Sequence, residues 1–467
     1  MWLDLARRPQ EQAGSPRRDW GGPEPSADVY GVVWCLGGHG GRAELPASPV
    51  YRVGQALSEA NINTGWCGCL ETCAGYDRRW CPMRISAVRC FEVQGPAEIP
   101  AQEERQVGML DIYPHFASRP PAGPRDHQTG VYVQVEEAGG AYGLFGPIFP
   151  ETVPLIQNKL APMITGQDPR AGEYLWDVMY RSDRHARKGY LMMAISAVDC
   201  ALWDLRGKLA GEPVWRLLGG PTRPTVPCYA SMLGYSHEPA RIVARVREMV
   251  DAGYRAQKWF FRYGPNDGLV GMERNVTLAR IVREAAGPNI DLMFDCWMGW
   301  DLSYATRMIE RLEPFRPRWL EEAVPADRIA EFAQMRDAGR VPIATGEHEY
   351  TRWGFLQLLQ TGGVDVLQAD PDWCGGISEL VKIGTLASAY GRHVIPHGHS
   401  VYAAAHVVAS QPPVTFPMAE YLVRYQPMAQ HFHTHMLVPE GGAITLPTLP
   451  GLGIEIDPAK VTSRRDL

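Results

Sequence analysis

A repeated unit, made of a short apolar strand, a loop and an amphipathic helix, runs from about Thr225 to Glu420. It recurs at intervals of roughly 25 residues, the length of one strand–helix unit. Strands that alternate with helices pair in parallel, and this many units close into a barrel with its helices outside. The candidate strands are 256–260, 291–295, 318–322, 343–347, 364–370 and 393–397. The repeat therefore predicts an α/β chain built on a TIM-type barrel.

The residues before the repeat predict a smaller α+β domain. The segment that starts at Met83 alternates apolar and polar residues like a half-buried strand, and Val131–Glu136 does the same. Residues 96–129 are rich in Pro, Gly and charged residues, which is typical of a loop. Leu191–Lys208 is apolar on more than one face, which indicates a buried helix. The predicted boundaries are 83–220 for this domain, 221–422 for the barrel and 423–467 for a carboxyl-terminal segment.

Residues 1–82 differ from the rest of the chain. They are rich in Gly, Pro, Arg and Trp and show no sustained period of 2 or 3.6. We interpret them as a non-native or disordered amino-terminal extension, upstream sequence read as protein, with the start at Met83. The alternative is a zinc module on Cys67, Cys69, Cys73 and Cys81. This alternative is weaker, because their spacing lacks the paired C-x-x-C knuckles of structural zinc sites.

Composition and charge exclude several classes of function. The formal net charge of −6 and the isoelectric point near 6.1 argue against a nucleic-acid partner, which usually leaves a basic footprint. The sequence lacks an apolar run of the ~18 residues that a membrane span needs, and its amino terminus lacks the apolar core of a signal peptide. The five cysteines after residue 82 are scattered, which is typical of a reducing compartment. We therefore expect a cytoplasmic protein without nucleic-acid or membrane partners.

Three carboxylates stand at the expected ends of consecutive strands. Two equal steps of 26 residues separate Asp295, Glu321 and Glu347, one strand–helix unit each. Side chains at the carboxyl ends of barrel strands converge on one face, where such enzymes keep their active sites. A single carboxylate would more often be a surface residue or a helix cap. Three converging carboxylates repel one another unless a cation neutralises them, and all-oxygen ligation favours magnesium over zinc. The spacing therefore predicts a magnesium site.

A carboxylate and a histidine follow on the next two candidate strands. Asp370 and His397 lie 27 residues apart, so neighbouring strand ends would present them to each other. A carboxylate that accepts a hydrogen bond from an imidazole orients the ring and raises its basicity. A lone histidine would more often be structural, but a histidine paired with Asp370 and facing a metal site is typical of a general base.

The set Asp295, Glu321, Glu347, Asp370 and His397 resembles the active site of the mandelate racemase branch of the enolase superfamily. Three longer motifs are similar to those of the L-rhamnonate dehydratase group in this branch: TGEHEYTRWGF at 345–355, QADPDWCGGISELVKI at 368–383 and PHGHSVY at 396–402. The resemblance covers about residues 83–455. It implies a modified TIM barrel, (β/α)7β, under an α+β capping domain to which the carboxyl-terminal segment returns.

The resemblance implies a sugar acid dehydratase with Mg²⁺ as its cofactor. The cation, held by the three carboxylates, would bind the substrate carboxylate and stabilise the enediolate, while His397 and Asp370 remove the adjacent proton. Loss of the 3-hydroxyl would then give a 2-keto-3-deoxy sugar acid. This step needs an acid, either protonated His397 or His348, and His348 has the alternative role of hydrogen-bonding the substrate. Glu322, beside Glu321, would support the metal site.

The second barrel strand departs from the pattern of the racemases in this branch, which carry Lys-x-Lys there. Here Lys258 is followed two places later by Phe260, and a single strong base suits elimination better than racemisation. Lys258 either pairs with the substrate carboxylate or is a surface lysine at a strand end.

Several further expectations accompany the resemblance. Two loops, near 103–128 and 142–148, would choose the substrate, a small acid sugar, and a homo-oligomer is expected. A racemase, epimerase or cycloisomerase that acts on an acid sugar is the nearest alternative. A non-catalytic binding protein on the same fold is the alternative of another class, because a fold does not dictate a function.

Overall fold

The computed structural model describes residues 83–467, with the exception of Ala186. Two expectations lie outside these residues: the extension at 1–82 and its alternative, a zinc module on Cys67, Cys69, Cys73 and Cys81.

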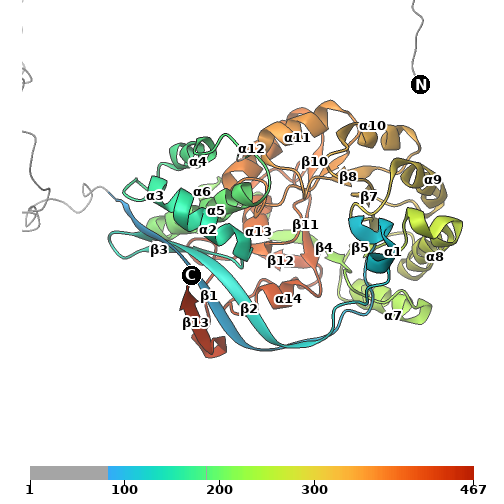
Figure 1. Cartoon of the computed structure of the whole chain (residues 1–467), viewed down its shortest axis with the longest axis horizontal. Coiled ribbons are helices and arrows are strands. Elements are labelled where there is room, and N and C mark those ends of the chain that lie inside the picture. The colour runs from blue at the N-terminus through green and yellow to red at the C-terminus, as the bar shows by residue number, and fades with distance from the viewer. Residues whose placement is uncertain (1–82, 186) are drawn as a thin grey trace, which may run out of the picture. The chain divides into compact units, whose positions relative to one another are not determined.

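The larger domain is a barrel of parallel strands wrapped by helices (Figure 1). Its strands in chain order are β4 (Thr225–Ser231), β5 (Ala256–Phe260), β6 (Asp291–Asp295), β7 (Trp319–Glu321), β8 (Ile343–Thr345), β9 (Val366–Leu367), β10 (His393–Val394) and β11 (Ala419–Leu422). They pair in the order β10-β9-β8-β7-β6-β5-β4-β11. β10 and β11 stand at the two ends of this order. Two hydrogen bonds link the chain around them: the Val394 N–H donates to the Thr415 carbonyl at 2.8 Å, and the Gly398 N–H donates to the Glu420 carboxylate at 2.9 Å. This arrangement confirms the predicted fold class.

A helix follows each of the first seven barrel strands and covers the outside of the sheet. These helices are α7 (Pro239–Asp251), α8 (Gly268–Ala286), α9 (Leu302–Leu312), α10 (Ile329–Asp337), α11 (Thr351–Gln360), α12 (Gly376–Ala389) and α13 (Val401–Ser410). These helices bury an apolar stripe, as amphipathic helices do. In α9, for example, Tyr304, Met308 and Leu312 are buried at helical spacing.

Four barrel strands are shorter than the sequence predicts. The expected strands 318–322 and 343–347 are Trp319–Glu321 and Ile343–Thr345, and two others lose more residues. The expected strands 364–370 and 393–397 shrink to Val366–Leu367 and His393–Val394. Pro396 contributes to the early ending of β10, because proline has no N–H to donate to a sheet. Asp370 and His397 therefore lie on loops beyond the strand ends.

The smaller domain is an antiparallel sheet packed on helices. The sheet has the order β13-β1-β2-β3, with β1 (Ile85–Ile99), β2 (Arg125–Glu137), β3 (Tyr142–Phe145) and β13 (Ser463–Asp466). Its helices are α2 (Val153–Leu155), α3 (Ala161–Ile164), α4 (Gly172–Arg181), α5 (Tyr190–Ala210) and α6 (Val214–Leu217). The carboxyl-terminal segment contains α14 (Gln426–Ala429) and β12 (Ala443–Thr445). Its β12 pairs antiparallel with β4 of the barrel, whereas its β13 pairs with β1 of the smaller domain.

Helix α5 is the buried helix that the sequence predicts, and it lies against β3. The Leu144 N–H donates to the Asp204 carboxylate at 2.8 Å. A Cβ on Gly143 would lie 2.0 Å from the Ala201 carbonyl oxygen, so only glycine permits this approach.

The loop between β1 and β2 is shorter than expected and is partly helical. The predicted loop at 96–129 is wrong at its ends, because β1 continues to Ile99 and β2 begins at Arg125. Between them lie a 3-10 turn, η2 (Met109–Ile112), and α1 (Pro114–Ala117). Arg262, which follows β5, donates to the Ala117 carbonyl at 2.9 Å. The loop is therefore attached to the barrel.

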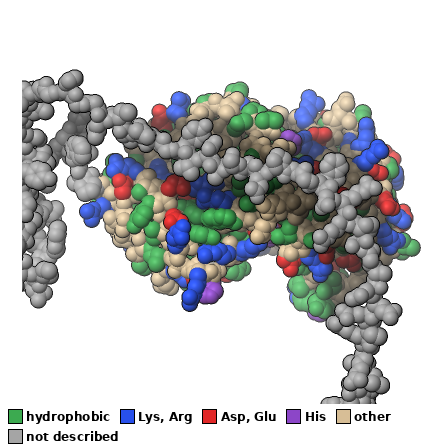
Figure 2. All heavy atoms as spheres, turned by 90° about the horizontal axis from the view of Figure 1, so that it is seen from above, with side chains coloured by type: hydrophobic (Ala, Val, Ile, Leu, Met, Phe, Trp, Pro, Cys, Tyr) green, Lys and Arg blue, Asp and Glu red, His purple; other side chains and the backbone are tan. Residues whose placement is uncertain are grey.

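The surface combines charges of both signs. Figure 2 shows Lys and Arg side chains interspersed with Asp and Glu over one face of the molecule. Within residues 83–467, leaving out Ala186, we find no helix whose length and apolar character would let it cross a membrane.

Candidate active site

The carboxyl end of the barrel gathers buried carboxylates. Asp295 and Glu321 are the last residues of β6 and β7, and Glu347 lies two residues beyond β8. Each is at most 3% exposed. Neighbouring parallel strands in register place Asp295 directly beside Glu321. The strand positions inferred from the 26-residue spacing are therefore present in the fold.

Lys258 lies inside this group of carboxylates. Its side chain points into the barrel from the middle of β5 and is 1% exposed. The ammonium is 3.0 Å from Asp295 Oδ2 and 2.9 Å from Glu420 Oε1, and it also pairs with Glu321. The alternative of a surface lysine at a strand end is therefore wrong. The sequence places Lys258 on a strand, but its inward direction depends on the pleat of that strand in the closed barrel.

Glu420 is a residue that the sequence analysis missed. It lies on β11, is fully buried, and contacts both Lys258 and the backbone of Gly398. Its signal in the sequence is an ionisable residue in the short apolar run Met418–Leu422, at the end of the repeat. A charged residue on a buried strand needs a partner, so such a residue is a site candidate.

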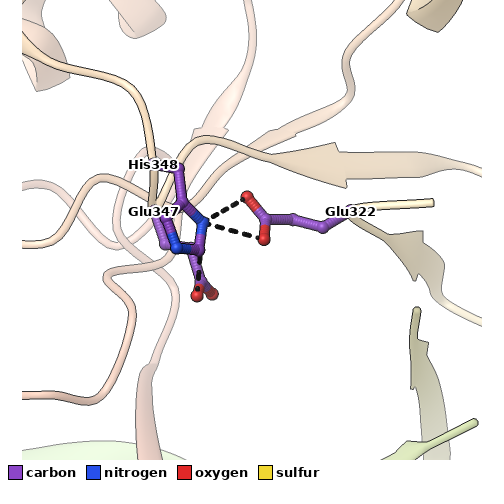
Figure 3. Close-up of side chains that lie close together, drawn as sticks. All are labelled: Glu322, Glu347 and His348. Atoms are coloured by element: carbon purple, nitrogen blue, oxygen red, sulfur yellow. Dashed lines mark hydrogen bonds and ion pairs between the residues drawn. The ribbon is translucent and has the colours of Figure 1, made fainter. Parts of the chain in front are cut away.

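A second compact group shares Glu347 with the predicted ligands (Figure 3). The His348 Nδ1 atom is 3.0 Å from Glu322 Oε2 and 3.6 Å from Glu347 Oε1. One ligand atom from each of Glu322, Glu347 and His348 lies within 4.8 Å of the other two. The structure thus brings these three residues together, whereas Asp295 and Glu321 contact Lys258. Burial opposes the protonation of His348, but Glu322 and Glu347 together outweigh burial and raise the pKa of His348 to about 9.

Strained backbone fixes the turns after β6 and β7. Trp297, Met298 and Glu322 have φ angles of 44°, 56° and 41°, in the left-handed region that non-glycine residues rarely adopt. The Trp297 N–H donates to Asp295 Oδ1 at 2.9 Å, and the Met298 N–H donates to the Glu322 carbonyl at 2.6 Å. Each such residue costs on the order of 1–3 kcal/mol, and this kind of strain clusters at functional sites.

The predicted histidine–carboxylate pair forms at the loops beyond β9 and β10. The His397 Nδ1 atom is 2.6 Å from Asp370 Oδ2. The other ring nitrogen, Nε2, lies 3.6 Å from Glu347 Oε2, on the side of the carboxylate group. The Asp372 N–H donates to Asp370 Oδ1 at 2.7 Å and fixes the carboxylate. The geometry is that of an oriented imidazole whose free nitrogen faces the carboxylates.

The carboxylates fit a bound divalent cation. Burial raises the pKa of Asp295 and Glu321, and that of Glu347 to about 8, because a buried carboxylate charge without a partner is costly. Lys258 brings a single positive charge to this group. A divalent cation would offset the remaining negative charge, and carboxylate oxygens suit magnesium better than zinc.

The surroundings of His397 point the same way. Burial alone would lower the pKa of His397, but Glu347 and the hydrogen bond to Asp370 outweigh burial and hold it well above its usual range. A cation on Glu347 would weaken the largest of these opposing effects. The neutral imidazole that a base needs is therefore compatible with an occupied metal site.

A (β/α)7β barrel under an α+β domain, with carboxylates at its strand ends and a histidine–aspartate pair beside them, defines an enzyme of the enolase superfamily. Residues 241–460 match the family model described as enolase C-terminal domain-like. Residues 114–219 match the amino-terminal domain of the mandelate racemase / muconate lactonizing enzyme family. The chain belongs to this family.

Its similarity to particular proteins is more specific. The chain is 37% identical over 396 residues to an L-rhamnonate dehydratase of Saccharopolyspora erythraea, covering 80% of this chain and 97% of that protein. The crystal structure of a rhamnonate dehydratase from Gibberella zeae complexed with Mg superposes with a TM-score of 0.71 at 29% identity, covering 81% and 95% of the two chains. A 3,6-anhydro-D-galactonate cycloisomerase from Zobellia galactanivorans superposes with a TM-score of 0.65 at 28% identity, covering 81% and 98%.

Proposed function

We propose that this protein is a magnesium-dependent dehydratase of sugar acids, with a substrate like L-rhamnonate. The observation that carries the proposal is the His397–Asp370 pair, whose free nitrogen faces buried carboxylates at the strand ends. The similarity to a curated L-rhamnonate dehydratase over almost its whole length supports the reaction class.

Magnesium would be held by Asp295, Glu321 and Glu347. These residues offer oxygen donors alone, whereas the group of Glu322, Glu347 and His348 includes an imidazole nitrogen, which magnesium favours less. When bound, the cation would act as a Lewis acid that stabilises negative charge on the substrate carboxylate. Glu322 would then hold the His348 ring, because both of its oxygens lie within 3.1 Å of Nδ1.

His397 would remove the proton beside the substrate carboxylate, and Asp370 would keep its ring in place. His348 would serve as the acid that protonates the departing 3-hydroxyl or as a hydrogen-bond partner of the substrate. Lys258 would stabilise the negative charges of the protein's own carboxylates, because its ammonium contacts Asp295, Glu321 and Glu420 directly. The product would be a 2-keto-3-deoxy sugar acid.

A cycloisomerase is the second candidate, because one similar structure is that of a 3,6-anhydro-D-galactonate cycloisomerase. A racemase is less favoured, because Phe260 stands where racemases of this branch carry a second lysine. A non-catalytic binding protein is also disfavoured, since the pair and all three carboxylates are present. The homo-oligomeric state and the cytoplasmic location stay predictions.

The test is to incubate the protein with five- and six-carbon aldonates and Mg²⁺ in deuterated water. We expect release of water and formation of a 2-keto-3-deoxy product. EDTA should abolish both. A product that retains all of its oxygens would identify a racemase or cycloisomerase. Failure to exchange the α-proton of every acid sugar tried would support the non-catalytic alternative.

A further inference from the structure

A second histidine–carboxylate pair lies beside the first, and the proposed reaction does not use it. The His399 Nδ1 atom is 2.6 Å from Asp372 Oδ2, the same distance as between His397 and Asp370. Each residue of the second pair lies two positions after its counterpart in the first. The same two loops therefore carry both pairs, and the second pair joins these loops side chain to side chain.

The backbone of the second pair also contacts the first pair. The His399 N–H donates to Asp370 Oδ2 at 3.3 Å, the oxygen that His397 contacts. The Asp372 N–H donates to the other oxygen of Asp370. Asp370 is therefore held by two backbone donors, and each donor belongs to a residue of the second pair.

Aromatic rings connect His399 to the smaller domain. Phe149, just beyond β3, stacks on the His399 ring with a centroid distance of 5.2 Å and an interplanar angle of 15°. Trp373 contacts both histidine rings, at 4.9 Å from His397 and 5.3 Å from His399. Tyr425 packs on His399 at 5.4 Å. The second pair therefore lies between the first pair and the smaller domain.

We propose that His399 and Asp372 are positioning residues that hold Asp370, and through it the His397 ring, in the orientation that proton removal needs. The proposal rests on the proposed function for its kinetic consequence. Its geometric content, that the second pair fixes the first, stands apart from the identity of the substrate. Partners of this kind, which orient another ligand or base, change activity by about 10–100-fold when they are removed.

Two matched substitutions separate the hydrogen bond from the ring stacking. His399→Phe keeps a ring against Phe149 but loses the bond to Asp372, whereas His399→Asn keeps a donor near the position of Nδ1 but loses the ring. We expect His399→Phe and Asp372→Asn to lower the kcat for α-proton exchange by about 10–100-fold and to change KM by less than about threefold. His399→Asn should retain most of the activity.

A spectroscopic measurement tests the same point without turnover. In protein with ¹⁵N-labelled histidine, the proton between His397 and Asp370 gives a downfield signal, which His397→Asn assigns by its loss. We expect this signal to shift or broaden in His399→Phe and Asp372→Asn and to persist in His399→Asn. His406 is the internal control, because it is buried and binds the Trp215 N–H and the Leu452 carbonyl.

The outcomes are distinct. An unchanged His397 signal in His399→Phe and Asp372→Asn, or a kcat within about threefold of wild type in both, would overturn the proposal. A raised KM with unchanged kcat would make His399 a substrate-binding residue and would also overturn it. If wild-type protein exchanges no acid sugar, the proposed function fails, and the His397 signal still decides whether the second pair positions the first.

Discussion

Lys258 places a positive charge among three buried carboxylates of the site. Its ammonium contacts three carboxylates that burial would otherwise leave unpaired. Lys258→Met should lower the free energy of unfolding in EDTA by about 3–5 kcal/mol, because one partner of a buried ion pair is removed. Mg²⁺ should recover part of this loss by supplying the missing positive charge.

Urea unfolding with EDTA and with Mg²⁺ measures both effects of Lys258→Met. Lys382→Met is the matched control, because its partner Glu173 is 78% exposed. The control should cost less than about 1 kcal/mol and show no dependence on Mg²⁺. A Lys258→Met variant as stable in EDTA as wild type would contradict the assignment.

The adjacent residues Glu321 and Glu322 separate the two candidate ligand groups. If Asp295, Glu321 and Glu347 hold the metal, Glu321→Gln should abolish measurable Mg²⁺ binding in calorimetry, because it removes a charged ligand. Glu322→Gln should weaken binding by only about 10–100-fold, as expected for a residue that supports a ligand. A greater loss of Mg²⁺ binding in Glu322→Gln than in Glu321→Gln would place the metal in the group of Glu322, Glu347 and His348.

His348 has two candidate roles, which one substitution separates. If His348 protonates the leaving hydroxyl, His348→Asn should still exchange the α-proton in deuterated water while the release of product falls by about 10²–10⁴-fold. If it binds the substrate, exchange and elimination should fall together. His397→Asn is the control, because the loss of the base should stop both.

At the scale of elements, buried His406 joins α13 to α6 and to the carboxyl-terminal segment. Its Nδ1 accepts the Trp215 N–H at 3.0 Å, so Nε2 carries the proton and donates to the Leu452 carbonyl at 3.3 Å. Burial lowers the pKa of His406 from 6.5 to about 4, because the charged ring is poorly solvated there. As the pH falls, the imidazole of His406 therefore becomes protonated in the unfolded chain before it does in the folded chain.

The sign of the pH dependence follows from that pKa. The stability that neutral His406 contributes is complete above pH 6.5 and is lost as the pH falls toward about 4, by up to about 3 kcal/mol. We expect His406→Asn to be less stable than wild type at pH 7.5 and to lose less stability between pH 7.5 and 5. The exposed His115→Asn should follow wild type. Equal pH dependence in wild type and His406→Asn would contradict this explanation.

At the scale of the whole molecule, α5 and α12 join the smaller domain to the barrel. The Asp199 carboxylate accepts the Ser378 N–H at 2.9 Å and the Ser378 hydroxyl at 2.7 Å. A Cβ on Gly376 would lie 2.3 Å from Asp199 Oδ2, so the helices meet closely at this glycine. This contact lies at the start of α12, a few residues after Asp370, and couples the smaller domain to the active-site loop.

Asp199→Ala should therefore affect both stability and activity. We expect it to lower the free energy of unfolding by about 1–3 kcal/mol, because two buried donors lose their acceptor. Hydrogen exchange should become faster in residues 370–378, and kcat should fall. Ser378→Ala is the control that keeps the Asp199 carboxylate and the Ser378 N–H. It removes the hydroxyl with its bonds to Asp199 and to the Trp203 indole N–H, at about 1–3 kcal/mol. Normal exchange in this loop in Asp199→Ala would show that α5 does not hold it.

The sequence by itself determined the features that repeat locally. The period of strands and helices predicts the barrel, and equal 26-residue steps place Asp295, Glu321 and Glu347 at or just beyond the ends of successive strands. The pairing of Asp370 with His397 also follows from the repeat, since neighbouring units bring their ends together. These inferences succeed because position along a strand–helix unit translates directly into position around the barrel.

Only the tertiary structure decided the other contacts between side chains of the site. The inward direction of Lys258, its contact with Glu420, and the meeting of Glu322 with His348 depend on the strand pleat and on left-handed turns at strand ends. The second pair, His399 with Asp372, forms because the loops after β9 and β10 bring these two side chains within hydrogen-bond distance. Such contacts join residues far apart in the chain, and no local period encodes them, because burial and long-range packing select each partner.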